Sequence, residues 1–198
     1  TNIFTNELQS NGTYKFYLAF KNSELDFIKF YETLPENELK NYTTYQYNHI
    51  SNIQGNEMHK NVVLITVESL SAEFMKCYGN QENITPFLDE LAQKSLFFTN
   101  LYATGNRTVR GLEAVTLCLP PTPGESIVKR LDNKNKFSTG SIFKEKGYQV
   151  KFLYGGDAFF DNMKDFFGGN GYDVVDKANF AANEVSFSNI WGVCDEDM

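Results

Sequence analysis

The sequence lacks the long apolar runs that mark membrane proteins and the leader that marks secreted ones. No apolar run reaches the roughly 18 residues that a membrane-spanning helix needs. The first residues, Thr1, Asn2 and Ile3, show no signal-peptide pattern. We therefore expect a soluble piece of a larger protein.

Cysteines, histidines and clustered basic residues are also few. Cys77, Cys118 and Cys194 are far apart and lack metal-ligand spacing, so they predict neither a zinc knuckle nor a disulfide framework, and their disulfide status stays open. His49 and His59 precede the predicted sheet and are interpreted as loop residues. The net charge is -7 and no Lys/Arg cluster occurs, which argues against a nucleic-acid partner.

Aromatic residues, in contrast, are abundant, and they predict a packed globular body. The 198 residues include 18 Phe and 11 Tyr, enough ring surface for one sizeable core. We expect a helical arm or linker over 1–60 and one domain over 61–198. Four aromatic residues at helical spacings predict a helix within 13–31 of the arm: Phe16, Phe20, Phe27 and Tyr31.

Strand-like and helix-like segments alternate after residue 60. Residues 62–67 (VVLITV) form an unbroken run rich in β-branched side chains, which is typical of a central strand covered on both faces. Thr85 and Pro86 mark a helix start, and Pro120 stops another helix that begins near Thr108. The alternation predicts an α/β fold with a mostly parallel central sheet flanked by helices. The other expected elements are strands at 95–99 and 148–154 and helices at 140–146 and 159–167.

Glu68 directly follows the first predicted strand. Ligands of open α/β sheets gather beyond the carboxyl ends of the strands. A carboxylate at that place is suited to hold a divalent cation, with Mg²⁺, Mn²⁺ and Zn²⁺ all compatible. The alternative is an acidic residue that favours a helix N-terminus.

Thr108 is the second candidate, at the predicted start of a helix. Free backbone N–H groups and the positive dipole end would favour an alkoxide and an anionic phosphoryl group there. A hydroxyl is a weak nucleophile, so Thr108 would need the cation of Glu68 beside it. Arg107 and Arg110 would clamp phosphate oxygens with their forked guanidinium groups. The alternative is a simple cap with two solvated arginines.

Asp157 is the third candidate, after the predicted strand at 148–154. Gly155 and Gly156 permit close backbone approach, and the Asp157 carboxylate would accept hydrogen bonds from substrate hydroxyls. The alternative is an N-cap for the following helix.

Together these segments resemble the opening half of the sulfatase family of the alkaline phosphatase superfamily, and within it the phosphoglycerol transferases similar to lipoteichoic acid synthase. The likeness covers about 60–198, with weaker similarity in the arm. Single motifs are weak, but their order and spacing are specific. The segments are 61–70 (NVVLITVESL), 85–89 (TPFLD), 97–102 (FFTNLY), 106–108 (NRT), 119–124 (LPPTPG), 154–157 (YGGD) and 190–197 (IWGVCDED).

The resemblance implies roles for four residues. Glu68 would be a metal ligand, and Thr108 both a ligand and the nucleophile that forms a phospho-threonine intermediate. Arg107 takes the place of a basic residue before the nucleophile, and Asp157 that of a head-group contact. The synthases have a histidine two residues before this aspartate, whereas this chain has Gly155.

The resemblance also implies partners and a place. These would be a membrane lipid that donates its head group and an envelope acceptor, on the extracytoplasmic face of a bacterial membrane. Attachment would use helices absent from this chain, and the donor lipid, acceptor, metal and oligomeric state stay open. Because family members complete the metal site with a downstream Asp-His pair, we expect this chain alone to be inactive and to bind metal weakly.

Two alternatives stay beside the transferase: a hydrolase of phosphate or sulfate esters, and a non-catalytic envelope interaction domain that keeps the fold. Sulfatases use a Cys or Ser followed by x-P-x-R, which is oxidised to formylglycine. The segment from Cys118 to Thr122 (CLPPT) begins that pattern but lacks the arginine. Sulfate-ester hydrolysis is therefore disfavoured.

Overall fold

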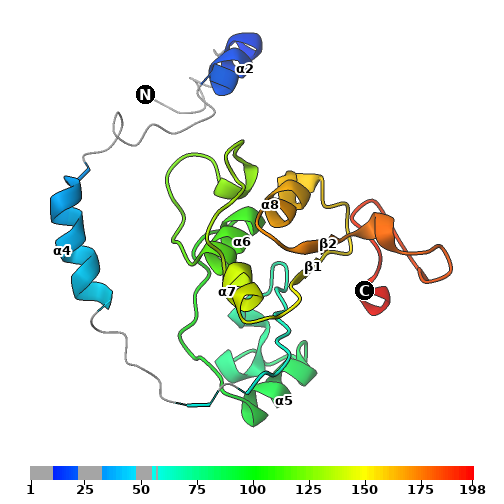
Figure 1. Ribbon diagram of the computed structural model, residues 1–198. Helices are drawn as coiled ribbons and strands as arrows, with labels where there is room; N and C mark the ends of the chain where they lie inside the picture. The colour runs from blue at the N-terminus through cyan, green and yellow to red at the C-terminus, as the bar shows by residue number, and fades with distance from the viewer. Residues whose placement is uncertain (1–10, 22–32, 48–54, 57) are drawn as a thin grey trace. The chain divides into compact units, whose positions relative to one another are not determined.

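The computed structural model describes residues 11–21, 33–47, 55–56 and 58–198. The chain divides into two compact units. Figure 1 labels the α-helices and the strands. The first comprises Thr1–Tyr31 and Ala103–Met198, and the second is Glu32–Tyr102. The boundary that we predict at residue 60 stays a prediction.

Helices occur in the predicted arm. Helix α2 spans Gly12–Lys21 and buries none of its residues, and helix α4 spans Glu36–Tyr47. The helix predicted within 13–31 is thus observed up to Lys21. The rest of its range, with Phe27 and Tyr31, lies outside the described residues.

The described part of the second unit is helical. Besides α4, its elements are the 3-10 helices η1, Ala72–Phe74, and η2, Lys76–Tyr78, and helix α5, Pro86–Lys94. Asp89 ties α5 to η2, because its carboxylate accepts hydrogen bonds from the Cys77 amide at 3.2 Å and the Thr85 hydroxyl at 3.0 Å. The predicted helix start at Thr85 and Pro86 is confirmed, although Thr85 makes no side-chain cap bond.

Two strand predictions in the second unit are wrong. The described backbone has no strand over 62–67 or 95–99, and the side chain of Val63 is 83% exposed. The physical reason is that a strand needs a second backbone to pair with. The described part of this unit contains no strand that could pair with either run.

The first unit contains a two-stranded parallel sheet, formed by β1, Lys151–Leu153, and β2, Asp173–Val175. Phe152 lies opposite Val174, and helix α8, Met163–Gly169, lies between the strands in the chain. This crossover confirms the predicted α/β class. The strand predicted at 148–154 is observed over three residues, and β2 was not predicted.

The other helices of the first unit follow the predicted order, with one break. The helix predicted over 159–167 is split into η4, Phe160–Asn162, and α8, because Asp161 and Asn162 both adopt positive φ. Asp and Asn tolerate this left-handed backbone better than most residues. The remaining elements are α6 (Thr108–Leu117), η3 (Ile127–Lys129), α7 (Thr139–Glu145), η5 (Lys177–Asn179) and η6 (Asp195–Asp197).

The core of the first unit joins α6 and α8. Phe166 is fully buried, and the ring of Phe167 stacks on that of Phe152 at a centroid distance of 3.7 Å. The other buried members are Val109, Leu112, Leu117, Val128 and Met163. One face of α6 is therefore anchored in the core, which fixes the helix that begins at Thr108.

Candidate active site

Thr108 is the first residue of α6 and is exposed. The cap itself is Arg107, whose backbone is extended, with φ -127° and ψ 141°. The Arg107 carbonyl oxygen accepts the amides of Arg110 at 2.9 Å and Gly111 at 3.2 Å, which closes the first turn. Thr108 therefore lies one residue inside the helix, and its hydroxyl belongs to the turn where the helix dipole is positive.

Arg107 also has an exposed side chain. No ion pair of this guanidinium is found among the residues that the structure describes. A permanently charged fork beside the first turn of α6 is suited to bind an anion. The structure is therefore compatible with the predicted role of Arg107, which stays a prediction.

The loop before α6 is packed tightly on the helix. A Cβ atom added to Gly105 would lie 2.8 Å from the Cβ of Arg110 and 3.7 Å from the Cγ of Pro121. Only glycine fits this approach without a shift of its neighbours. The path of the chain into Thr108 is thus set by contact with the stem of Arg110.

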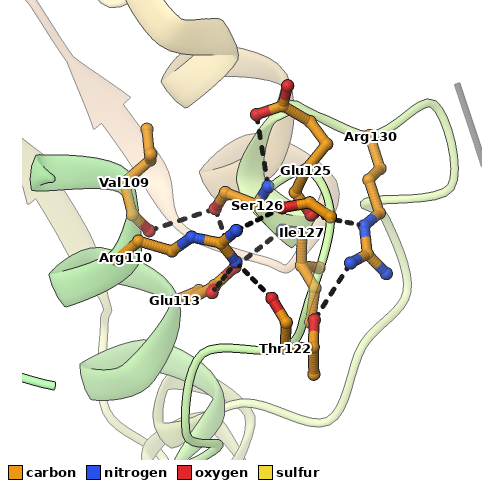
Figure 2. A network of polar contacts seen from close by, with 9 residues as sticks. Val109, Arg110, Glu113, Thr122, Glu125, Ser126, Ile127 and Arg130 are labelled. Atoms are coloured by element: carbon orange, nitrogen blue, oxygen red, sulfur yellow. Dashed lines mark hydrogen bonds and ion pairs between the residues drawn. The ribbon is translucent and has the colours of Figure 1, made fainter. Parts of the chain in front are cut away.

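Arg110 points into the protein, and the interpretation of its side chain as a phosphate clamp is wrong. Its Nη1 donates to Glu113 Oε1 at 2.9 Å and to the Thr122 carbonyl oxygen at 2.9 Å, and its Nη2 donates to the Gly124 carbonyl oxygen. The side chain is 18% exposed. These bonds use the fork for internal contacts, so Arg110 is not solvated either (Figure 2).

Glu113 lies at the centre of this network, and sequence reasoning missed it. Its side chain is 1% exposed. Its Oε2 accepts the Ser126 hydroxyl at 2.7 Å and the Ile127 amide at 2.6 Å, as Figure 2 shows. An acid three residues after Arg110, within an apolar helical stripe, was the available signal.

Asp157 follows β1 and is exposed. Its Oδ1 accepts the amide of Phe159 at 2.9 Å, which closes a local turn. The alternative of an N-cap is not observed, because the cap residue of the following helix η4 is Phe159. Substrate recognition by the carboxylate stays a prediction.

The two glycines before Asp157 are closely approached by the C-terminal hairpin. The Val193 amide donates to the Gly155 carbonyl oxygen at 2.8 Å, and a Cβ atom on Gly156 would lie 2.5 Å from the Trp191 carbonyl oxygen. Close backbone approach is what glycine permits. Here the approaching backbone is the protein's own, and it fixes the loop that carries Asp157.

Glu68 lies in the second unit and Thr108 in the first, so their convergence stays a prediction. The Glu68 carboxylate is exposed, and the Ser69 hydroxyl donates to its Oε1 at 3.4 Å. Carboxylate and hydroxyl oxygens are ligands that divalent cations bind. The described residues hold no group of three or more His, Cys, Asp or Glu side chains that could bind a metal ion together, and the metal role of Glu68 stays a prediction.

The chain has a counterpart among solved structures. The crystal structure of a protein in the alkaline phosphatase superfamily from Vibrio parahaemolyticus matches with a TM-score of 0.54 and 49% sequence identity. The match covers 57% of this chain and 28% of that chain. This protein therefore has an α/β fold of the alkaline phosphatase type.

The family follows from the sequence profile of the sulfatases, which matches residues 60–198. The chain belongs to the sulfatase family, which is a family of enzymes. The resemblance that the motifs indicated is thereby confirmed.

Characterised proteins with similar sequences include a synthase and a transferase. The chain is 26% identical to lipoteichoic acid synthase 2 of Bacillus subtilis over 159 residues, which are 77% of this chain and 24% of the relative. It is 25% identical to phosphoglycerol transferase I of Xanthomonas campestris over 150 residues, 71% of this chain and 21% of the relative. The chain thus spans about a quarter of the length of these relatives. None of the helices in the described ranges has the length and apolar character needed to cross a bilayer.

Proposed function

We propose that this protein is a metal-dependent transferase that moves a phosphoglycerol or phosphoethanolamine head group from a membrane lipid onto an envelope acceptor. The reaction would run through a phosphorylated Thr108 on the extracytoplasmic face of a bacterial membrane. The observation that carries the proposal is the exposed position of Thr108 as the first residue of α6, a helix anchored in the core. The likeness to a lipoteichoic acid synthase and a phosphoglycerol transferase supports the reaction type.

The first step forms one bond and breaks another at phosphorus. The Thr108 oxygen forms a bond to phosphorus and loses its proton, while the lipid alcohol leaves with the electron pair of its P–O bond and takes up a proton. The positive dipole end of the first helical turn favours the negative charge of the phosphoryl group. Arg107 would bind its oxygens.

The second step returns the enzyme to its starting state. A hydroxyl of the acceptor attacks the phosphorus of phospho-Thr108, and the threonine oxygen leaves and regains a proton. Asp157 would accept a hydrogen bond from a head-group hydroxyl. A divalent cation held partly by Glu68 and Thr108 would supply Lewis acidity and lower the pKa of the nucleophile.

Two variants of the nucleophile test the proposal. In the full gene product, with a glycerophospholipid donor and Mn²⁺, Mg²⁺ or Zn²⁺ in turn, Thr108→Ala should abolish head-group release. Thr108→Ser keeps a hydroxyl and should retain measurable release. Mass spectrometry of the peptide that carries residue 108 should find a phosphoryl group in the parent protein. Unchanged release by Thr108→Ala would eliminate Thr108 as the nucleophile.

A hydrolase is the second candidate, and the sulfatase family assignment favours it. Water would then replace the acceptor in the second step. Cys118 ends α6 with φ 55°, and no arginine follows in the pattern that sulfatases use. The same assay distinguishes the candidates, because a hydrolase releases head group without any added acceptor. Absence of both reactions with every metal would favour a non-catalytic envelope domain.

A further inference from the structure

Arg110 joins three segments that meet around the start of α6. Its stem packs against Gly105 in the loop before the helix, where an added Cβ would lie 2.8 Å away. Its guanidinium donates to the carbonyl oxygens of Thr122 and Gly124 in the segment after the helix. Because Arg110 belongs to the same first turn as Thr108, movement of this turn would disturb all of these contacts.

The carboxylate of Glu113 makes this junction stiff. It is buried and receives Arg110 Nη1 at 2.9 Å, the Ser126 hydroxyl at 2.7 Å and the Ile127 amide at 2.6 Å. A buried carboxylate that loses a donor is left partly uncompensated, which is costly. The network therefore favours a single arrangement of helix and flanking loops.

We propose that Arg110 is a positioning residue for Thr108. Its stem packs against the loop before the helix and its guanidinium holds the loop after the helix, so that the Thr108 hydroxyl and the first turn keep one geometry toward the substrate. This proposal rests on the proposed transferase reaction. Arg110 itself does not contact the reacting atoms in this account, because its donors are directed to Glu113 and two carbonyl oxygens.

Substitutions at Arg110 separate the fork from the stem. Arg110→Met keeps the apolar stem against Gly105 but removes every guanidinium bond. Arg110→Lys keeps the charge for Glu113 but cannot form the planar fork. A misplaced group costs about a hundredfold in rate per ångström. We expect kcat to fall about a hundredfold in Arg110→Met and about tenfold in Arg110→Lys, with KM changed less than about twofold in both.

A matched control lies elsewhere in the same unit. Tyr172→Phe removes the hydroxyl that accepts the Gly140 amide at 2.9 Å, so it removes a hydrogen bond to α7 and none of the bonds of Arg110. Its kcat should equal that of the parent protein once both are corrected for the folded fraction. Equal kcat losses in Arg110→Met and Tyr172→Phe at equal folded fraction would show a purely structural role and overturn the proposal.

Hydrogen exchange of residues 105–109 provides a readout that needs no activity. We expect exchange of these amides to become at least about tenfold faster in Arg110→Met and to stay unchanged in Tyr172→Phe. If Thr108→Ala abolishes head-group release while Arg110→Met keeps the hydrogen exchange and the kcat of the parent protein, the positioning proposal is overturned and the proposed transferase reaction is left standing. If Thr108→Ala retains head-group release, the proposed transferase mechanism is wrong. The proposal that Arg110 positions the nucleophile is then overturned as well, and hydrogen exchange tests only whether Arg110 orders this loop.

Discussion

Gly192 is the position where a single added methyl group should release the C-terminal hairpin. The hairpin is held by the antiparallel bridge of Ser188 with Val193, by the Asn189 amide on the Gly192 carbonyl oxygen at 2.9 Å, and by the Val193 amide on Gly155 at 2.8 Å. In Gly192→Ala the new Cβ would lie 2.3 Å from the Gly155 carbonyl oxygen. The φ of +153° adds backbone strain for any residue with a Cβ.

The response of the hairpin depends on the strain energy of Gly192→Ala relative to the stabilisation by the hairpin's hydrogen bonds. A strained backbone of this kind costs about 1–3 kcal/mol. The two backbone hydrogen bonds named above contribute about 1–3 kcal/mol together, at the usual net value for such bonds. Since the strain is as large as the contacts that it opposes, we expect the hairpin to leave Gly155 while the core around Phe166 stays folded.

The assay is hydrogen exchange at the Val193 amide, supported by fluorescence anisotropy of Trp191, the only tryptophan. Loss of about 1–3 kcal/mol of local stability corresponds to exchange that is about fivefold to 150-fold faster. Gly147→Ala is the matched control, because Gly147 also has a positive φ, +84°, but nothing lies within 4 Å of its added Cβ. A Val193 amide as protected in Gly192→Ala as in the control would refute the steric reasoning.

Two further predictions concern the core and the acidic C-terminus. Phe166→Ala should lower the free energy of unfolding of the first unit by about 3–5 kcal/mol, measured by denaturant titration, because the ring is fully buried. A hydrogen bond from the Cys194 thiol, with others from Ser186, lowers the pKa of Asp197 to about 2. A carboxyl group whose pKa is lower in the folded state stabilises the fold at pH values above its unfolded-state pKa. This contribution should therefore be lost as the pH falls from about 4 to 2. NMR titration of the Asp197 carboxyl group should show the low pKa in the parent and a higher one in Cys194→Ala.

The helices could be predicted because their signals are local. Pro86 marks the start of α5, and the apolar stripe with Val109 and Leu112 gives the extent of α6. Capping residues, proline and helical spacing act within one or two turns, so a single sequence contains them. The aromatic stripe over 159–167 did not reveal the break at Asp161 and Asn162, because the helical spacing of its aromatic residues continues across the break.

The candidate site was predictable in part. The place of Thr108 in the first turn of a helix followed from spacing, and the structure has it there. The roles of Arg110 and Glu113 did not follow, because they depend on Thr122, Gly124 and Ser126, which lie nine or more residues away. Sequence spacing placed two arginines near Thr108, but only packing shows that Arg110 is used internally.

Strands show the opposite behaviour to helices. Strand β2 has three residues and no pattern of its own, yet it forms because Lys151–Leu153 pairs with it. The run at 62–67 has a strong strand composition, yet its side chains are exposed, from 56% for Val67 to 83% for Val63. Burying five such apolar side chains would contribute roughly 7–15 kcal/mol, which is comparable with the whole stability of a domain. The composition of this run therefore indicates how much free energy its burial would contribute, whereas pairing with a second backbone decides whether it becomes a strand.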